Sequence, residues 1–146
     1  MVCIEEEVEI SASLEKVWES FTSFTCWADW NAVLAQVKSS SGSCLDKNGR
    51  FTCCVNPFGV PIFFEAGVDE ITPMERIVWT GSKYMVRGWH EFLFTEKEGK
   101  VRLFSREILT GPPVAFGGLF FPVWRFRSLT RKFLEGLRSY AEEGGA

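Results

Sequence analysis

The stretch that decides the fold is residues 122–143, PVWRFRSLTRKFLEGLRSYAEE, near the end of the chain. At about 100° per residue, its apolar and small side chains gather on one side of a helix of about 21 residues, roughly 31 Å long. That side holds Phe126, Leu129, Thr130, Phe133, Leu134, Gly136, Leu137, Tyr140 and Ala141. Pro122 suits the first turn, and Gly144 with Gly145 is expected to end the helix. No single neighbouring helix would cover so wide an apolar side, so we expect a curved sheet to hold it.

The segments before this helix predict the strands of that sheet. Residues 2–10 alternate between apolar and polar side chains, with Glu6 as the exception on the apolar face. Glu98-Gly99 is a hairpin turn signal. Further strands are expected over residues 50–55, 62–71, 76–81, 86–95 and 101–110.

Two short helices are expected after the first strand. The first covers residues 14–23 and is capped by Ser11 or Ser13, and the second lies near residues 27–34. No repeat or linker divides the chain. Residues 1–146 are therefore expected to form one α+β domain, with a curved antiparallel sheet of about seven strands around the long helix.

The composition is rich in rings and low in net charge. Aromatic residues make up 15% of the chain, with 14 Phe and 6 Trp, so either the core is rich in rings or some rings line a cavity. The net charge of −3 argues against a nucleic-acid partner. The basic side chains near the C-terminus are expected to form the solvent face of the long helix, which favours neither nucleic acid nor an anionic membrane as a partner. These are Arg125, Arg127, Arg131, Lys132 and Arg138.

The cysteines predict neither disulfides nor a metal site. Their number is odd, their spacing is not that of zinc ligands, and the chain has one histidine. We expect reduced thiols at Cys3, Cys26, Cys44, Cys53 and Cys54, with no bound metal and no cofactor. No apolar span of about 18 residues and no basic-then-apolar leader occurs, so we expect a cytoplasmic protein without a membrane span. The sequence assigns no oligomeric state.

Six motifs, in order along nearly the whole chain, resemble those of the START/Bet v 1-like superfamily, also called the SRPBCC or polyketide cyclase/dehydrase group. They are Ala12-Ser-Leu-Glu-Lys-Val-Trp18, Trp27-Ala-Asp-Trp30-Asn31, Ile77-Val-Trp79-Thr-Gly81, Gly88-Trp-His90-Glu-Phe92, Arg106-Glu107-Ile-Leu-Thr-Gly111 and Phe133-Leu-Glu-Gly-Leu137. The resemblance implies a helix-grip fold, in which a seven-stranded antiparallel sheet grips the C-terminal helix and a cavity lies between them.

Members of this superfamily differ in function, so the resemblance implies three alternatives. The first is a protein that binds a small hydrophobic molecule such as a lipid, a polyketide or another secondary metabolite. The second is a cyclase or dehydratase of secondary-metabolite biosynthesis. The third is a co-chaperone-like interaction module. The fold alone does not separate them.

His90 and Glu107 are the candidates for acid–base chemistry. Alternation puts His90 on one face with Phe92, and Glu107 on one face of the next strand with Ser105. If both faces point into the cavity, the imidazole and the carboxyl group lie within reach of each other. Such a couple can serve as general acid and base, or it can satisfy itself within the sheet and orient a ligand.

Nine further residues are candidates for ligand binding. Asn31 is expected either to orient a ligand carbonyl or to cap a helix. Trp124 is expected to pack on the preceding link or to line the cavity mouth. The full set is Trp30, Asn31, Phe51, Phe64, Trp79, Phe92, Ser105, Trp124 and Phe133.

Overall fold

A computed structural model describes residues 1–40, 42–57, 59–117 and 120–144 of the chain. Gly145, expected to help end the long helix, lies outside these residues. The elements in chain order are β1 (Val2–Ile10), α1 (Leu14–Thr22), α2 (Phe24–Trp30), β2 (Ala35–Ser39), β3 (Arg50–Val55), β4 (Ile62–Thr72), β5 (Arg76–Lys83), β6 (Val86–Lys97), β7 (Lys100–Thr110), α3 (Pro112–Gly117) and α4 (Val123–Glu142).

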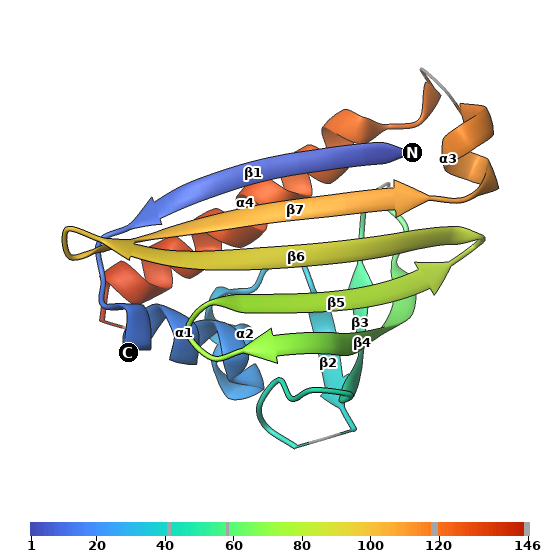
Figure 1. Ribbon diagram of the computed structural model, residues 1–146. Helices are drawn as coiled ribbons and strands as arrows, with labels where there is room; N and C mark the ends of the chain where they lie inside the picture. Colours follow the sequence, from blue (N-terminus) through green and yellow to red (C-terminus); the bar gives the residue numbers. More distant parts are fainter. Residues whose placement is uncertain (41, 58, 118–119, 145–146) are drawn as a thin grey trace.

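The seven strands form one antiparallel sheet in the order β1-β7-β6-β5-β4-β3-β2, which curves around α4 (Figure 1). The helices α1 and α2 lie at the end of the sheet where the chain terminates, whereas α3 and the turn between β5 and β6 lie at the opposite end. The predicted helix-grip fold is confirmed.

The long helix α4 faces the sheet with the side that the periodicity predicts. Thr130, Phe133, Leu134, Leu137 and Ala141 are its buried residues. Gly136 is required where α4 crosses the end of α2, because a Cβ atom there would overlap the carbonyl oxygen of Trp30. The helix is therefore held along its length by both the sheet and the two short helices.

Glu6, the polar exception on the apolar face of β1, points at α4. Its Oε1 atom lies 3.1 Å from Nη1 of Arg127 and accepts a hydrogen bond of 2.9 Å from Nε of Arg131. Two arginines of the predicted solvent face of the helix are thus tied to the first strand. The carboxylate is satisfied at the edge of the core by charge-assisted hydrogen bonds.

Rings from α1, α2 and the sheet fill the end of the core beneath the short helices. Phe21 is fully buried and packs edge-on against Phe92 and Phe133. The indole Nε1 of Trp27 donates to the carbonyl of Phe21 at 2.8 Å. These contacts close that end of the sheet, so any cavity must lie toward the other end.

Three local features differ from the sequence-based expectations. The second helix ends at Trp30 instead of near residue 34, because Oδ1 of Asn31 accepts hydrogen bonds from the backbone N–H groups of Val33 and Leu34 and turns the chain. The chain then forms β2, which was not predicted as a strand. Residues 112–117 form the short helix α3, which was not among the predicted elements.

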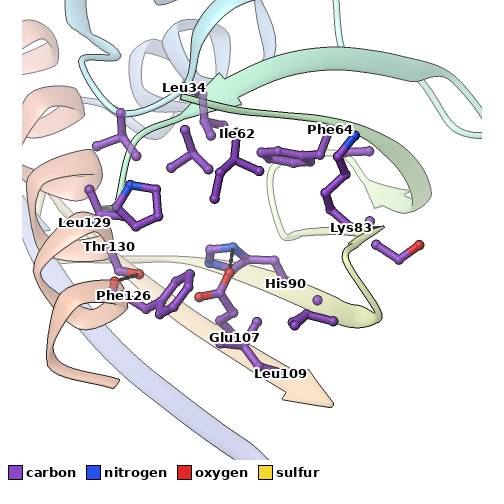
Figure 2. Close-up of a pocket in the computed structure, with 18 of the residues that line it drawn as sticks. Leu34, Ile62, Phe64, Lys83, His90, Glu107, Leu109, Phe126, Leu129 and Thr130 are labelled. Atoms are coloured by element: carbon purple, nitrogen blue, oxygen red, sulfur yellow. Dashed lines mark hydrogen bonds and ion pairs between the residues drawn. The ribbon is translucent and has the colours of Figure 1, made fainter. Parts of the chain in front are cut away.

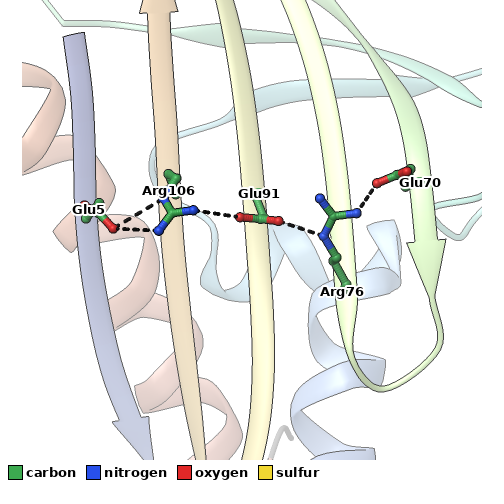
Figure 3. Close-up of polar contacts among 5 residues, drawn as sticks. All are labelled: Glu5, Glu70, Arg76, Glu91 and Arg106. Atoms are coloured by element: carbon green, nitrogen blue, oxygen red, sulfur yellow. Dashed lines mark hydrogen bonds and ion pairs between the residues drawn. The ribbon is translucent and has the colours of Figure 1, made fainter.

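The convex face of the sheet carries a line of alternating charges across five strands (Figure 3). Glu91 of β6 lies at its centre, 2.7 Å from Nε of Arg76 and 3.6 Å from Nη1 of Arg106. Arg106 also pairs with Glu5 at 3.1 Å, and Arg76 pairs with Glu70. We call these five residues the outer charge ladder.

Candidate functional site: a cavity between the sheet and α4

A cavity of about 400 Å³ lies between the concave face of the sheet and α4 (Figure 2). Its inner wall is formed by buried side chains, including Phe51, Ala66, Trp79 and Phe133. Its other end is bordered by the exposed residues Lys83, Tyr84 and Pro113, so it opens to solvent there. The volume is within the range of pockets that hold drug-sized molecules.

His90 and Glu107 face each other on the wall of this cavity. They are directly opposite in the antiparallel pairing of β6 and β7. Their side chains therefore leave the sheet on the same face, with Nδ1 of His90 3.4 Å from Oε2 of Glu107. Both residues line the cavity, and Figure 2 shows them between α4 and the sheet.

Burial moves the pKa values of these two groups in opposite directions. It lowers the pKa of His90 to about 3, because the imidazolium loses hydration. It raises the pKa of Glu107 to about 7, because the carboxylate loses hydration. Near neutral pH the imidazole is therefore uncharged, and the carboxyl group is divided between its protonated and ionised forms.

Ser105 completes a chain of three groups. Its hydroxyl lies 2.7 Å from Nε2 of His90. With Glu107 ionised, the favoured tautomer has Nδ1–H directed at the carboxylate, and Nε2 accepts from the Ser105 hydroxyl. With Glu107 protonated, its O–H faces Nδ1, and Nε2–H donates to Ser105. The protonation state of Glu107 thus selects the tautomer of His90.

The order Ser105, His90, Glu107 has the connectivity of a serine nucleophile, its base and an orienting acid. Ser105 is nevertheless fully buried and is not among the cavity-lining residues. Its hydroxyl is therefore closed to a substrate in the cavity and serves to hold the imidazole. Phe92 also supports the imidazole of His90, because the two rings stack at a centroid distance of 4.1 Å.

The structure brings together six of the predicted site residues around the cavity. The two polar ones are His90 and Glu107, and the four aromatic ones are Phe51, Phe64, Trp79 and Phe133. Phe92 and Ser105 lie behind the wall and support His90. Together these eight residues form part of the cavity wall and the layer beneath it.

The other three predicted residues lie elsewhere. Trp30 is buried, and its indole Nε1 donates to the carbonyl of Ser20 at 3.0 Å. Asn31 is buried as the cap after α2, and its Nδ2 atom has no hydrogen-bond partner among the described residues. Trp124 does not line the cavity and is 69% exposed.

Several lining residues were not predicted. Those of α4 are on its predicted apolar side, where Phe126 and Leu129 are half-buried and Thr130 is buried, so the width of that side was the available signal. Those of the two hairpins lie in or next to connections, where alternation gives no information. The unpredicted residues include Val33, Leu34, Val55, Pro57, Ile62, Lys83, Val86, Phe126, Leu129 and Thr130.

The family described as "Polyketide cyclase / dehydrase and lipid transport" matches residues 1–142 of the chain. No curated protein matches the chain. Among the described residues, no helix is long and apolar enough to cross a membrane.

Solved structures share the fold at low sequence identity. The hypothetical protein jhp0584 from Helicobacter pylori is 20% identical, with a TM-score of 0.79 over 96% of this chain and 88% of that one. The protein TTHA0849 from Thermus thermophilus is 13% identical, with a TM-score of 0.83 over 99% of this chain and 100% of that one. The di-domain ARO/CYC BexL from the BE-7585A biosynthetic pathway is 14% identical, with a TM-score of 0.75 over 95% of this chain and 46% of that one. At these identities the likeness establishes the fold.

Proposed function

The chain belongs to the polyketide cyclase / dehydrase and lipid transport family, and we propose that it binds a small hydrophobic molecule with one carbonyl or hydroxyl group in the cavity between its sheet and α4. The observation that carries this proposal is a cavity of about 400 Å³ that is walled by rings and aliphatic side chains and holds the polar pair His90 and Glu107 on its wall. Lipids, polyketides and other secondary metabolites have this combination of an apolar body and few polar groups.

Apolar burial is expected to supply most of the affinity. Each Å² of apolar surface removed from water contributes about 25 cal/mol, so a ligand that fills the cavity gains far more from its body than from one hydrogen bond. The side chains that face this body come from α4 and from the sheet, as Phe126 and Phe64 illustrate. The polar pair then sets the orientation of the ligand.

The pair also selects the charge of the ligand's inner end. Near neutral pH, His90 is uncharged, and Glu107 is either neutral or negatively charged. A second buried anion beside Glu107 would be repelled and would lose its hydration. We therefore expect a neutral carbonyl or hydroxyl at this end, which accepts from protonated Glu107 or donates to ionised Glu107.

A cyclase- or dehydratase-type enzyme is the second candidate. The observation that favours it is the pKa of Glu107, which burial raises to about 7. An acid or base with a pKa near the working pH is the most effective general catalyst. In this alternative Glu107 and His90 exchange a proton with the substrate, and the apolar walls hold the substrate in a folded conformation.

The co-chaperone-like alternative predicts a filled interior and an apolar surface patch. The open cavity supports ligand binding instead.

A titration with the hydrophobic fluorescent dye ANS tests the binding proposal. Leu129→Trp fills the cavity from α4, and Ser128→Trp adds the same ring at the neighbouring exposed position as a matched control. We expect Leu129→Trp to weaken dye binding at least tenfold and Ser128→Trp to leave it unchanged, with both variants folded by circular dichroism. Equal dye binding by folded Leu129→Trp and wild type would overturn the proposal.

Native mass spectrometry of co-purified molecules separates the binder from the enzyme. A binder carries the same molecule in the wild type and in His90→Gln. An enzyme that removes water retains product in the wild type, whereas His90→Gln retains a substrate heavier by one water. For either function, Glu107→Gln should weaken binding about 5- to 30-fold, which corresponds to about 1–2 kcal/mol for one charge-assisted hydrogen bond.

A further inference from the structure

Exposed apolar side chains gather at the open end of the cavity. The described residues include eight exposed large hydrophobic side chains, and all except Met1 lie on three segments: the β3–β4 hairpin, the β5–β6 hairpin, and the stretch from α3 to the start of α4. The same three segments supply Pro57, Lys83 and Pro113 to the cavity lining. The seven residues are Val60, Phe63, Tyr84, Met85, Phe116, Phe120 and Trp124.

Contacts between the three segments show that they form one surface. Nε of Arg125, at the start of α4, donates to the carbonyl of Pro57 in the β3–β4 hairpin. Gly111, just before α3, packs so closely on Met85 in the β5–β6 hairpin that a Cβ atom would overlap its carbonyl oxygen. The surface thus surrounds the opening of the cavity, and we call it the mouth surface.

The aromatic side chains of this surface are presented outward by structure beneath them. In α3, Val114 is buried beside Ile4 and Leu109 and anchors the helix, while Phe116 is 89% exposed. Phe120 is 95% exposed. The hydrophobic effect opposes such exposure, so a large ring held in water on an anchored helix calls for a partner.

The β5–β6 turn supports the same conclusion. Tyr84 and Met85 form its tip with φ angles of 52° and 66°, a conformation that Asn and Gly adopt at little cost and bulky residues rarely adopt. Both side chains are exposed. Backbone strain of this kind persists where the surrounding structure imposes it, and it concentrates at functional positions. Stability of the hairpin does not account for this choice of residues.

The charges of the mouth surface are all basic. Residues 51–64, 79–90 and 108–134 contain no Asp or Glu, although the whole chain has 19 acidic and 16 basic residues. Lys83, Arg87 and Arg125 lie within these segments, and none of them takes part in an ion pair among the described residues. The sequence pattern assigns Arg125 to a solvent face of α4, but the structure places it beside the ring of Trp124.

We propose that the mouth surface docks on an anionic lipid bilayer, with its aromatic side chains in the headgroup region and its basic side chains against the lipid phosphates. Trp and Tyr favour that region, and basic side chains are attracted to anionic lipid. A bilayer also accepts side chains that protrude from three separate segments, whereas a protein partner needs a matching pocket for each. Docking would place the cavity opening against the membrane.

The test measures binding of the 146-residue chain to vesicles by co-sedimentation. One vesicle contains phosphatidylcholine alone, and the other is an equal mixture of phosphatidylcholine and phosphatidylserine. We expect binding to the mixed vesicles and at least tenfold weaker binding to phosphatidylcholine. Absence of binding to the mixed vesicles overturns the proposal. That result would also be expected if the partner of the mouth surface were an acidic protein and not a bilayer.

Variants locate the bound surface. Lys83→Glu with Arg87→Glu should weaken binding at least tenfold, since each basic side chain contributes about fivefold. Phe116→Ser with Trp124→Ser should weaken it at least tenfold as well. Lys97→Glu makes the same kind of charge change at the β6–β7 turn, at the opposite end of the sheet, and should change binding less than twofold (Figure 1). Equal losses at the two ends would contradict docking through the mouth surface.

A second measurement does not depend on charge. Brominated lipids quench tryptophan only at short range, and Trp124 is the exposed tryptophan of the mouth surface. Quenching should be lost in Trp124→Phe while binding is retained, and retained quenching would contradict insertion of this side chain. Leu129→Trp, which blocks the cavity, should bind vesicles like the wild type. Failure of docking is thus distinguishable from failure of the proposed ligand site.

Discussion

Two glutamates on neighbouring positions of the β6–β7 pair occupy opposite environments. Arg106 is directly opposite Glu91, and the next pair along joins His90 to Glu107. Because side chains alternate across a sheet, Glu91 lies on the convex face and Glu107 on the concave face. Both are shielded from water, since the side chain of Glu91 is 8% exposed and that of Glu107 is 20% exposed.

The difference between them lies in their partners. Glu91 sits between two guanidinium groups, and its hydrogen bond is the main reason that the pKa of Arg76 is raised above its ordinary value. Glu107 faces an imidazole that burial keeps uncharged. Glu91 therefore forms ion pairs with two guanidinium groups, whereas Glu107 faces a neutral imidazole and burial raises its pKa to about 7.

This contrast shows how one sheet separates stability from reactivity. The outer charge ladder links five strands through ion pairs on the convex face. On the cavity face, His90 and Glu107 form a pair in surroundings that make their charged forms costly. A ligand beside this pair therefore meets a proton donor or acceptor, and Lys83 lies at the open end of the cavity.

The largest expected effect comes from removing the charge of Glu91. Glu91→Gln leaves Arg76 and Arg106 facing an amide, and breaking a buried ion pair costs about 3 kcal/mol or more. Because both arginines are partly exposed, we expect a loss of about 3 kcal/mol in the free energy of unfolding. Glu107→Gln mimics the protonated acid and should not lower the free energy of unfolding at that pH. Urea denaturation at about pH 6 measures both, and equal losses would remove the distinction.

The pH dependence of stability gives the next largest effect. In the folded protein near pH 5.5, Glu107 is protonated and His90 is not. In the unfolded chain, where the ordinary pKa values are 4.5 for Glu107 and 6.5 for His90, His90 is protonated and Glu107 is not. Unfolding then transfers a proton from one group to the other without net uptake. These two groups should give the wild type no slope in the free energy of unfolding between about pH 4.5 and 6.5.

Variants that remove one of the two groups should show the pH dependence of the free energy of unfolding that the other group contributes. In His90→Gln the folded state binds more protons than the unfolded state, so the free energy of unfolding falls with rising pH, by about 2 kcal/mol across that window. In Glu107→Gln the unfolded state binds more protons, so the free energy rises by a similar amount. Urea denaturation at several pH values measures both variants against the wild type. Parallel profiles for all three proteins would contradict the assigned pKa directions.

The sequence predicted the fold because two independent patterns agree. The wide apolar side of residues 122–143 requires a concave partner, and the alternating segments supply one. Ser13 was one of two predicted caps, and its hydroxyl accepts from the N–H of Lys16 in the structure. The strand β2 was missed because it has five residues, so its alternating pattern is too short to stand out, and most of them are exposed.

The site was predictable in part. Alternation identified the faces of His90 and Glu107 but not their contact. The turn at Glu98 and Gly99 contained that information, because Lys97 pairs with Lys100 and counting back along both strands places His90 opposite Glu107. The mouth of the cavity was not predictable in this way, since its residues lie in connections whose position depends on packing between distant segments.

The smallest expected effect lies at the end of the outer charge ladder. Glu5 and Arg106 are each exposed over 40% or more of their side chains, and their ion pair spans 3.1 Å at the surface. Water and salt screen such pairs, so Glu5→Gln should lower the free energy of unfolding by less than about 0.5 kcal/mol.

The effect of Glu5→Gln should grow when Glu91 is already changed. In the wild type, Arg106 keeps Glu91 as a partner when Glu5 is lost, but in Glu91→Gln it has Glu5 as its remaining carboxylate in the ladder. The double variant should therefore lose more than the two single variants together, by about 0.5–1 kcal/mol, because residues in one network are not additive. Urea denaturation of the four proteins gives this coupling energy, and added salt should reduce it. If the losses of the two single variants simply add in the double variant, the outer charge ladder acts as separate ion pairs. The difference in stability between changes at Glu91 and at Glu107 would then depend on the ion pairs of Glu91 alone.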